Sequence, residues 1–149
     1  MGTQHFKVEL TDYSVSVDEW RRAQSAPKDD LPELNVLQRE VATKFGISEE
    51  KYARSVLAGQ YGVQRIRTRA GKLGEETEKI LQETCAECRV VRVVADMARE
   101  RWVIVLRTRK RQFGITIARE VGDDLLDFSA LGAVEELKAK VKAGLGMKG

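Results

Sequence analysis

The chain contains 149 residues, which is enough for one domain, or one domain with a small appendage, and for a core without disulfides or metals. Charged residues make up 33% and apolar residues 42%, and this balance excludes an intrinsically disordered chain. No apolar run approaches the roughly 18 residues of a membrane span, and residues 1–9 lack the apolar stretch of a secretory signal. We therefore expect a soluble cytoplasmic protein with no membrane contact.

The charges lie in blocks of alternating sign, although the net charge is only +3. Residues 1–35, 36–72, 73–87, 88–119 and 120–149 carry −3, +5, −4, +7 and −2. If the two basic blocks share one face, they make a polyanion-binding surface, because clustered Lys and Arg attract phosphates and release counterions. Arg-rich strands are also typical of the solvated face of a sheet, so this second interpretation stays open.

The N-terminal segment predicts a strand followed by a short helix. Apolar residues alternate over residues 5–17, which predicts one strand or a short hairpin. Ser16 or Asp18 can cap a short helix that runs to Ala26. Both prolines of the chain lie in residues 26–32, which are the best candidate for a linker.

Residues 34–57 have the pattern of two helices joined by a tight turn. Gly46 can adopt the left-handed conformation that ends a helix, and Ser48 can cap the next one. The apolar residues of the first helix repeat at helical spacing: Leu34, Leu37, Val41 and Phe45. With Ala42 at the crossing and Tyr52 in the second helix, this segment resembles the helix-turn-helix of DNA-binding proteins.

The resemblance implies that the second helix enters the major groove, with Lys51, Arg54 and Ser55 as its outward side chains. Glu49 and Glu50 lie where that helix would approach the phosphates, and their charge opposes binding. A plain helical hairpin needs the same turn glycine and the same apolar crossing, and many such hairpins bind no nucleic acid. Both interpretations stay open on the sequence.

The next segment predicts a break, a basic connector and a third helix. Gly59 and Gly62 are expected to end the second helix. The connector, residues 64–70, carries three alternating cations that are candidate phosphate contacts: Arg65, Arg67 and Arg69. The apolar residues of the third helix are Leu73, Ile80, Leu81 and Cys85.

After Cys88 the apolar period changes from 3.6 to 2, which predicts three strands in an antiparallel meander. The first strand is expected to place Val91, Val93 and Ala95 on one side. The second, around residues 102–106, is apolar on both faces and is expected to be central and covered on both sides. A last helix is predicted from a cap at Ser129 to Gly144.

The expected fold is therefore α+β. It has a helical region with the helix-turn-helix-like pair, then a three- to five-stranded antiparallel sheet and a C-terminal helix. The N-terminal strand is expected to join the sheet, because a lone strand is not stable. The expected regions are 1–30, 31–87 and 88–149, which can also form one compact domain.

The junction of the second and third strands predicts a strongly basic hairpin tip. Its cations are Arg107, Arg109, Lys110 and Arg111. Such a tip can lie along a phosphate backbone or in a minor groove. The alternative is a solvated turn whose charge prevents edge pairing.

Metal and catalytic signals are weak. Cys85 and Cys88 form one Cys-x-x-Cys, and with His5 as the single histidine the chain cannot complete a standard Cys/His zinc site by itself. We expect two structural cysteines, no metal and no cofactor; a zinc site shared by two chains is the alternative. The four carboxylates considered for acid/base chemistry are expected to be structural or solvated: Asp96, Glu100, Asp123 and Asp124.

The expected function is non-catalytic nucleic-acid binding, with DNA preferred over RNA, by the helical pair and the basic hairpin. The candidate residues are Lys51, Arg54, Arg65, Arg67, Arg69, Arg107, Arg109, Lys110 and Arg111. The first alternative is a protein-interaction or assembly module, including a homodimer. The second is a small basic nuclease that stabilises phosphate charge without histidine.

Overall fold

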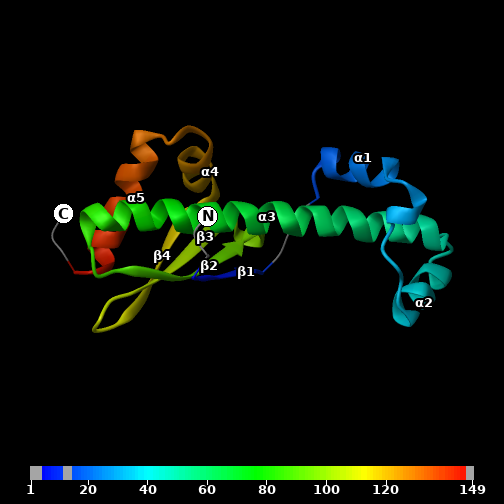
Figure 1. The fold of residues 1–149 in the computed structure, drawn as a ribbon, viewed down its shortest axis with the longest axis horizontal. Coiled ribbons are helices and arrows are strands. Elements are labelled where there is room, and N and C mark those ends of the chain that lie inside the picture. Colours follow the sequence, from blue (N-terminus) through cyan, green and yellow to red (C-terminus); the bar gives the residue numbers. More distant parts are fainter. Residues whose placement is uncertain (1–4, 12–14, 147–149) are drawn as a thin grey trace. The chain divides into compact units, whose positions relative to one another are not determined.

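The computed structural model describes residues 5–11 and 15–146. Within these ranges no helix combines the length and the apolar character that a membrane span requires. The elements in chain order are β1 (Lys7–Leu10), α1 (Val17–Ser25), the 3₁₀ turn η1 (Lys28–Asp30), α2 (Val36–Lys44), α3 (Glu49–Thr84), β2 (Arg89–Asp96), the 3₁₀ turn η2 (Met97–Arg99), β3 (Arg101–Arg107), β4 (Gln112–Ala118), α4 (Arg119–Phe128) and α5 (Leu131–Gly144) (Figure 1).

The chain divides into two compact units. The helical unit, residues 13–65, contains α1, α2 and the first part of α3. The sheet unit, residues 1–12 and 66–149, contains the strands, the rest of α3, α4 and α5. Helix α3 is continuous across residue 65, so it contributes to both units.

The start of the chain differs from the expected alternation over residues 5–17. The strand is limited to β1, and Val17 already begins α1. Tyr13, which was expected to continue the alternation, lies outside the described residues. Of the two predicted caps, Ser16 and Asp18, Ser16 caps the helix: its side chain accepts a hydrogen bond from the N–H of Glu19, and the Glu19 carboxylate accepts one from the Ser16 N–H.

Helix α3 contradicts the predicted break at Gly59 and Gly62 and the predicted connector over residues 64–70. A glycine inside a helix costs about 1 kcal/mol relative to alanine, so burial of the helix can outweigh several glycines. The sheet unit buries one stripe of α3 at helical spacing, and its apolar members are Ile66, Ala70, Leu73, Ile80 and Leu81.

The sheet has the order β1-β2-β3-β4. The meander of β2, β3 and β4 is antiparallel as predicted, and the N-terminal strand joins the sheet as predicted. However, β1 pairs with β2 in parallel, so the sheet is mixed and the expectation of a purely antiparallel sheet was wrong. The reason is the connection, because the long crossover through α3 brings the chain back in the same direction.

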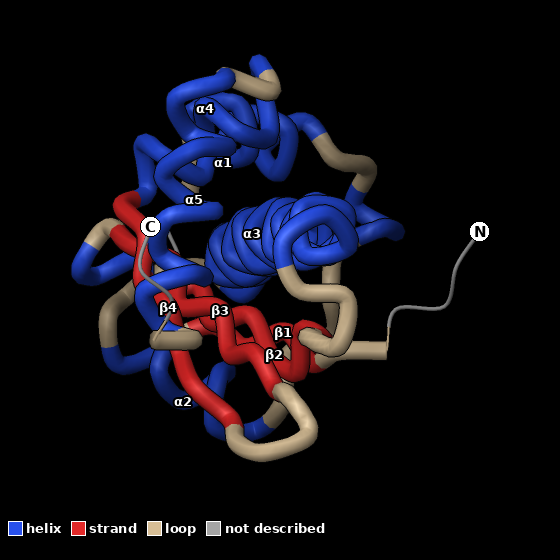
Figure 2. Tube along the Cα trace, turned by 90° about the vertical axis from the view of Figure 1, so that its left-hand side faces the viewer, coloured by secondary structure: helices blue, strands red, loops and turns tan. Residues whose placement is uncertain are grey.

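Helices α3, α4 and α5 all lie on one face of the sheet (Figure 2). Strand residues such as Val93, Ile104 and Ile117 point to this face and are fully buried. β3 is interior, as predicted, but these three helices cover one face only, in contrast to the expected cover on both sides. The other face is called the open face below.

The C-terminal region contains a helix that the sequence did not predict. α4 precedes α5, and its Leu125 is buried against the sheet core. Ser129 is not the cap of the last helix: it ends α4 in the left-handed conformation, with φ of 47°, and α5 begins at Leu131. Asp123 and Asp124, which the sequence analysis expected to be structural or solvated, lie in this helix.

Gly74 of α3 permits close contact with Phe6, and its replacement by alanine should destabilise the protein. A methyl group at this position would lie 2.3 Å from the Phe6 ring, which is itself buried. We expect Gly74→Ala to lower the free energy of unfolding by about 1–3 kcal/mol, measured by urea denaturation. Gly132→Ala is the control, because a methyl group there meets nothing within 4 Å. Equal stabilities of the two variants would contradict this packing.

Candidate nucleic-acid interface

The predicted turn between the two helices of the helical unit is present. Gly46 is left-handed with φ of 68°, and Ser48 accepts a hydrogen bond from the Lys51 N–H at 3.1 Å. The expected apolar stripe of the first helix is only partly packed: Leu34 is buried, whereas Leu37 and Phe45 are 68% and 73% exposed. The second helix is the 36-residue α3, and a helix-turn-helix is not confirmed.

Arg54 is held by hydrogen bonds to the end of α1 in the helical unit. Its Nη1 donates to the carbonyl oxygens of Ala23, Gln24 and Ala26 at 3.0, 3.0 and 2.8 Å. Its Nη2 donates to Glu50 Oε1 at 3.0 Å. The guanidinium therefore binds the carbonyl end of α1, where a cation is favourable, and is engaged inside its own unit.

Arg65 and Arg69 also have carboxylate partners. Arg65 Nε lies 2.9 Å from Glu19 Oε2. Arg69 binds Asp123 at 2.7 Å and Asp127 at 3.1 Å, and its pKa is raised, chiefly by the hydrogen bond to Asp127. On a helix, residues four apart share a face, so Arg67 points away from Arg65 and Arg69 and the three do not form one basic stripe. Arg67 is exposed, as is Lys51.

The basic hairpin is present between β3 and β4, and Thr108 orders its tip. The Thr108 N–H donates to the Arg111 carbonyl at 2.8 Å. The Thr108 hydroxyl accepts from the N–H groups of Lys110 and Arg111, both at 3.2 Å. Arg109 and Lys110 are exposed at this tip. The hairpin therefore presents two cations on a turn that is held by its own hydrogen bonds.

Arg111 fixes the hairpin to the end of α5 and has a different role from its neighbours. Its guanidinium donates to the carbonyl oxygen of Gly144 and lies over the Phe113 ring, 5.2 Å from the ring centre. Of the four predicted tip cations, three have no ion pair or side-chain hydrogen bond among the described residues, and all three are exposed: Arg107, Arg109 and Lys110.

The open face brings cations together that the sequence analysis did not combine. Arg89 of β2 is the direct register partner of Arg107 of β3, and both are exposed. Arg92 is the register partner of Lys7 of β1. Arg89, Arg107 and Arg109 also line a depression of about 350 Å³, together with Ala86, Glu87 and Thr108.

A β-bulge places Arg92 on this face. The register shifts between Val90 and Arg92, so that Val90 and Val93, three residues apart, both point into the core. Without the bulge, the strict alternation of a strand would point Arg92 to the same side as Val90. The expected side of the first strand is corrected accordingly: Val93 and Ala95 share the core with Val90, not with Val91.

Arg92 is also incompletely paired. Its Nη1 lies 3.6 Å from Glu9 Oε1, whereas its Nε is buried and has no hydrogen-bond acceptor among the described residues. A buried donor without an acceptor is unfavourable. The open face thus contains cations in cross-strand pairs and one unsatisfied guanidinium donor.

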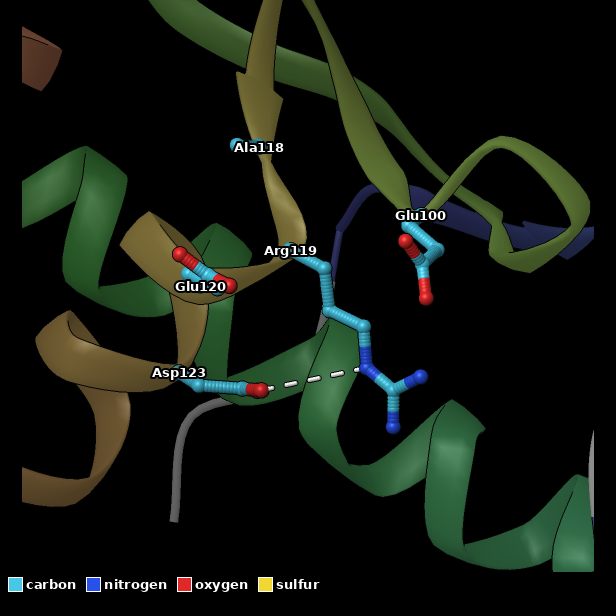
Figure 3. Close-up of a pocket in the computed structure, with 5 residues that line it drawn as sticks. All are labelled: Glu100, Ala118, Arg119, Glu120 and Asp123. Carbon is cyan, nitrogen blue, oxygen red and sulfur yellow. Dashed lines mark ion pairs between the residues drawn. The ribbon is translucent and has the colours of Figure 1, made fainter.

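A second depression, of about 470 Å³, lies at the other end of the meander (Figure 3). It is lined by Glu100, Ala118, Arg119, Glu120 and Asp123. Arg119 Nε lies 3.8 Å from Asp123 Oδ2, as the dashed line shows. Asp123 is thus shared between Arg119 and α3. The part of the chain that the structure describes contains no group of three or more side chains suited to a metal ion.

Asp96, the last residue of β2, forms hydrogen bonds to β3 and to the residue that follows β1 near this end of the sheet. Its carboxylate accepts hydrogen bonds from Arg101 Nε at 2.8 Å and from the Thr11 hydroxyl at 3.1 Å. Partial burial raises the pKa of Asp96, but the hydrogen bonds from Arg101 and Thr11 and the charge of Arg99 outweigh it, and the pKa is lowered. These contacts agree with the structural role expected from the sequence.

The two cysteines are free thiols in the structure, Cys85 half-buried and Cys88 buried. Burial raises the pKa of Cys88 to about 12, with further contributions from Cys85 and Glu87. A thiol with a raised pKa is a poor nucleophile at neutral pH. This environment fits the structural role expected for Cys88.

No protein family, characterised protein or solved structure shows significant similarity to this chain. The functional argument therefore depends on the surface chemistry. That chemistry is concentrated in six cations of the sheet unit, called the basic patch below: Lys7, Arg89, Arg92, Arg107, Arg109 and Lys110. Guanidinium and ammonium groups arranged in this way can bind several phosphate oxygens at once.

Replacement of Arg54 tests whether its hydrogen bonds to α1 stabilise the fold. We expect Arg54→Gln to lower the free energy of unfolding by about 1–3 kcal/mol, because three carbonyl oxygens at the end of α1 lose a charged donor. Lys51→Gln is the matched control on the same helix, and we expect a change within about 0.5 kcal/mol because Lys51 is exposed. Urea denaturation followed by circular dichroism measures both. If the two variants are equally stable, the contacts of Arg54 are unimportant.

Proposed function

We propose that this protein binds nucleic acid without catalysis, and that the basic patch of the sheet unit is its binding surface. The observation that carries the proposal is the direct cross-strand pairing of Arg89 with Arg107 on the open face. Opposite residues of paired strands have Cβ atoms about 5 Å apart, and like charges at this position are destabilising. A bound phosphate between the two guanidinium groups removes this repulsion.

The surroundings of the pair support an anionic ligand. Arg109 lines the same depression, and Glu87 is the one carboxylate among its lining residues. Lys7 and Arg92 form a second like-charged pair on the neighbouring strands, where Arg92 Nε still needs an acceptor. Several phosphates in a row supply the acceptors and the negative charge for both pairs, which favours a polyanion over a single small anion.

The carboxylates support the non-catalytic part of the proposal. Asp96 and Asp123 hold arginines of their own unit, at 2.8 and 2.7 Å, so their oxygens are engaged in the fold. None of the four carboxylates considered for catalysis lines the depression of the basic patch. We therefore expect purified protein to bind nucleic acid without cleaving it; cleavage that is lost on replacing one carboxylate would favour the nuclease alternative.

The Arg89→Gln/Arg107→Gln variant tests the proposal. We expect weaker binding to nucleic acid at low salt, and a double-logarithmic salt dependence that is shallower by about two, because each lost phosphate contact removes about one from the slope. Fluorescence anisotropy over a salt series measures both quantities.

The matched control removes two exposed cations from helices instead. Lys44→Gln/Lys72→Gln changes the net charge equally, and both lysines are exposed. We expect this control to keep the parent's salt dependence. An equal loss of binding in the two double variants would show that net charge alone, and not the basic patch, governs binding.

A protein-interaction module is the second candidate, and the helical unit favours it. The apolar cluster of this unit is small, and its buried members are Ala23, Leu57 and Ala58. Large apolar side chains are exposed on the same unit: Val17, Trp20, Val36, Leu37 and Phe45. Exposed apolar groups are typical of interaction surfaces where they lie together in one patch. Sedimentation at increasing protein concentration tests for self-association.

A further inference from the structure

We infer that the tip of the β3–β4 hairpin inserts into the major groove of duplex DNA, so that this chain selects double-stranded DNA over single strands and over duplex RNA. The inference rests on the proposed function and names the substrate class of the same basic patch. It is carried by three features of the sheet unit: the shape of the hairpin, the order of its tip, and the composition of the open face.

The tip of the hairpin has a suitable shape for a groove. Over Arg101–Arg107, β3 is paired with β2 as well as with β4, so the part without a third strand beside it is the turn after the Arg107–Gln112 pair, residues 108–111. This turn joins two strands about 5 Å apart, and the major groove of B-form DNA, about 12 Å wide, admits a two-stranded element of this width. Arg109 and Lys110 at the tip would enter the groove first. Arg107, one residue before the turn, would then lie beside the phosphates of the groove wall.

The tip is ordered before it meets a ligand. Thr108 closes the turn with its N–H and its hydroxyl, as described above. Arg111 joins the second strand of the hairpin to the end of α5. A hairpin fixed at both strands loses little conformational entropy on binding, which favours insertion as a rigid unit.

The open face lacks the side chains on which single strands stack. Its outward positions, read from the strand register among the described residues, contain no aromatic side chain: Lys7, Glu9, Arg89, Arg92, Val94, Asp96, Arg101, Val103, Val105, Arg107, Gln112, Gly114, Thr116 and Ala118. The aromatic residues of the strands, Trp102 and Phe113, pack with the core instead. Proteins that bind single strands combine cations with aromatic stacking platforms, so this surface offers a single strand electrostatic contacts alone.

Duplex RNA presents a different groove. The major groove of an A-form helix is deep and narrow, so a turn that joins two strands cannot enter it. The basic patch could still contact RNA phosphates from outside. The hairpin therefore predicts a preference for DNA among duplexes, in addition to the preference for duplexes over single strands.

The test compares three ligands of the same sequence and of about 20 nucleotides per strand, a length of roughly two helical turns: duplex DNA, single-stranded DNA and duplex RNA. Fluorescence anisotropy at about 50 mM salt measures each dissociation constant. We expect duplex DNA to bind at least about tenfold more tightly than either of the others. The second protein is Arg109→Gln/Lys110→Gln, whose changes lie in an exposed turn and leave the core intact.

The tip variant is expected to lose the preference for duplex DNA while it retains the weaker binding of single strands, because Arg89, Arg92 and Arg107 remain. The Lys44→Gln/Lys72→Gln control is expected to retain the preference. If single-stranded DNA or duplex RNA binds as tightly as duplex DNA, or if the tip variant keeps the preference, groove insertion is wrong and nucleic-acid binding stands. If none of the three ligands binds, the proposed function itself is wrong.

Discussion

The sheet unit depends on the burial of one face of its sheet by a single continuous helix. The second part of α3 provides a stripe from Ile66 to Leu81 that packs with strand residues such as Val93 and Ile104. Gly74 lets Phe6 approach the helix closely, which also fastens β1 to this core. α4 and α5 add to the same side. Because the covered face of the sheet supplies the apolar core, the residues of the open face can be charged without loss of that core.

The open face carries like-charged pairs that do not stabilise the fold. Two like-charged pairs lie directly across neighbouring strands, Arg89 with Arg107 and Lys7 with Arg92. In a sheet selected only for stability, opposite charges or apolar residues would occupy these positions. Elsewhere in the unit the charges are matched, as where Arg69 binds two aspartates. Under the proposed function, these cations serve a ligand, at a cost in stability of the kind common at functional sites.

The parts that could be predicted from the sequence are those that local interactions decide. The caps at Ser16 and Ser48 and the left-handed Gly46 depend on a few neighbouring residues, and the structure confirms all three. The three-strand meander follows from the apolar period of 2. In each case the signal and its cause lie within a short segment.

The remaining features depend on contacts between distant segments. The glycines of α3 do not end the helix because burial against the sheet outweighs their local cost, and no local pattern reports that burial. Arg54 and Arg69 look like free cations until their partners, 31 and 54 residues away, are placed beside them. Arg92 was missed because a bulge changes the alternation of β2. Arg89 was missed because its pairing with Arg107 requires the strand register.

Thermal unfolding of the Arg89→Gln/Arg107→Gln variant, with and without duplex DNA at low salt, tests the central claim most directly. If the pair is a binding feature that lowers stability, the free variant should unfold at the same temperature as the parent or slightly higher. Added DNA should then raise the midpoint of the parent more than that of the variant, because a ligand stabilises the folded state it binds. A free variant that unfolds at a clearly lower temperature, with equal stabilisation of both proteins by DNA, would show that the arginines support the fold and not the ligand.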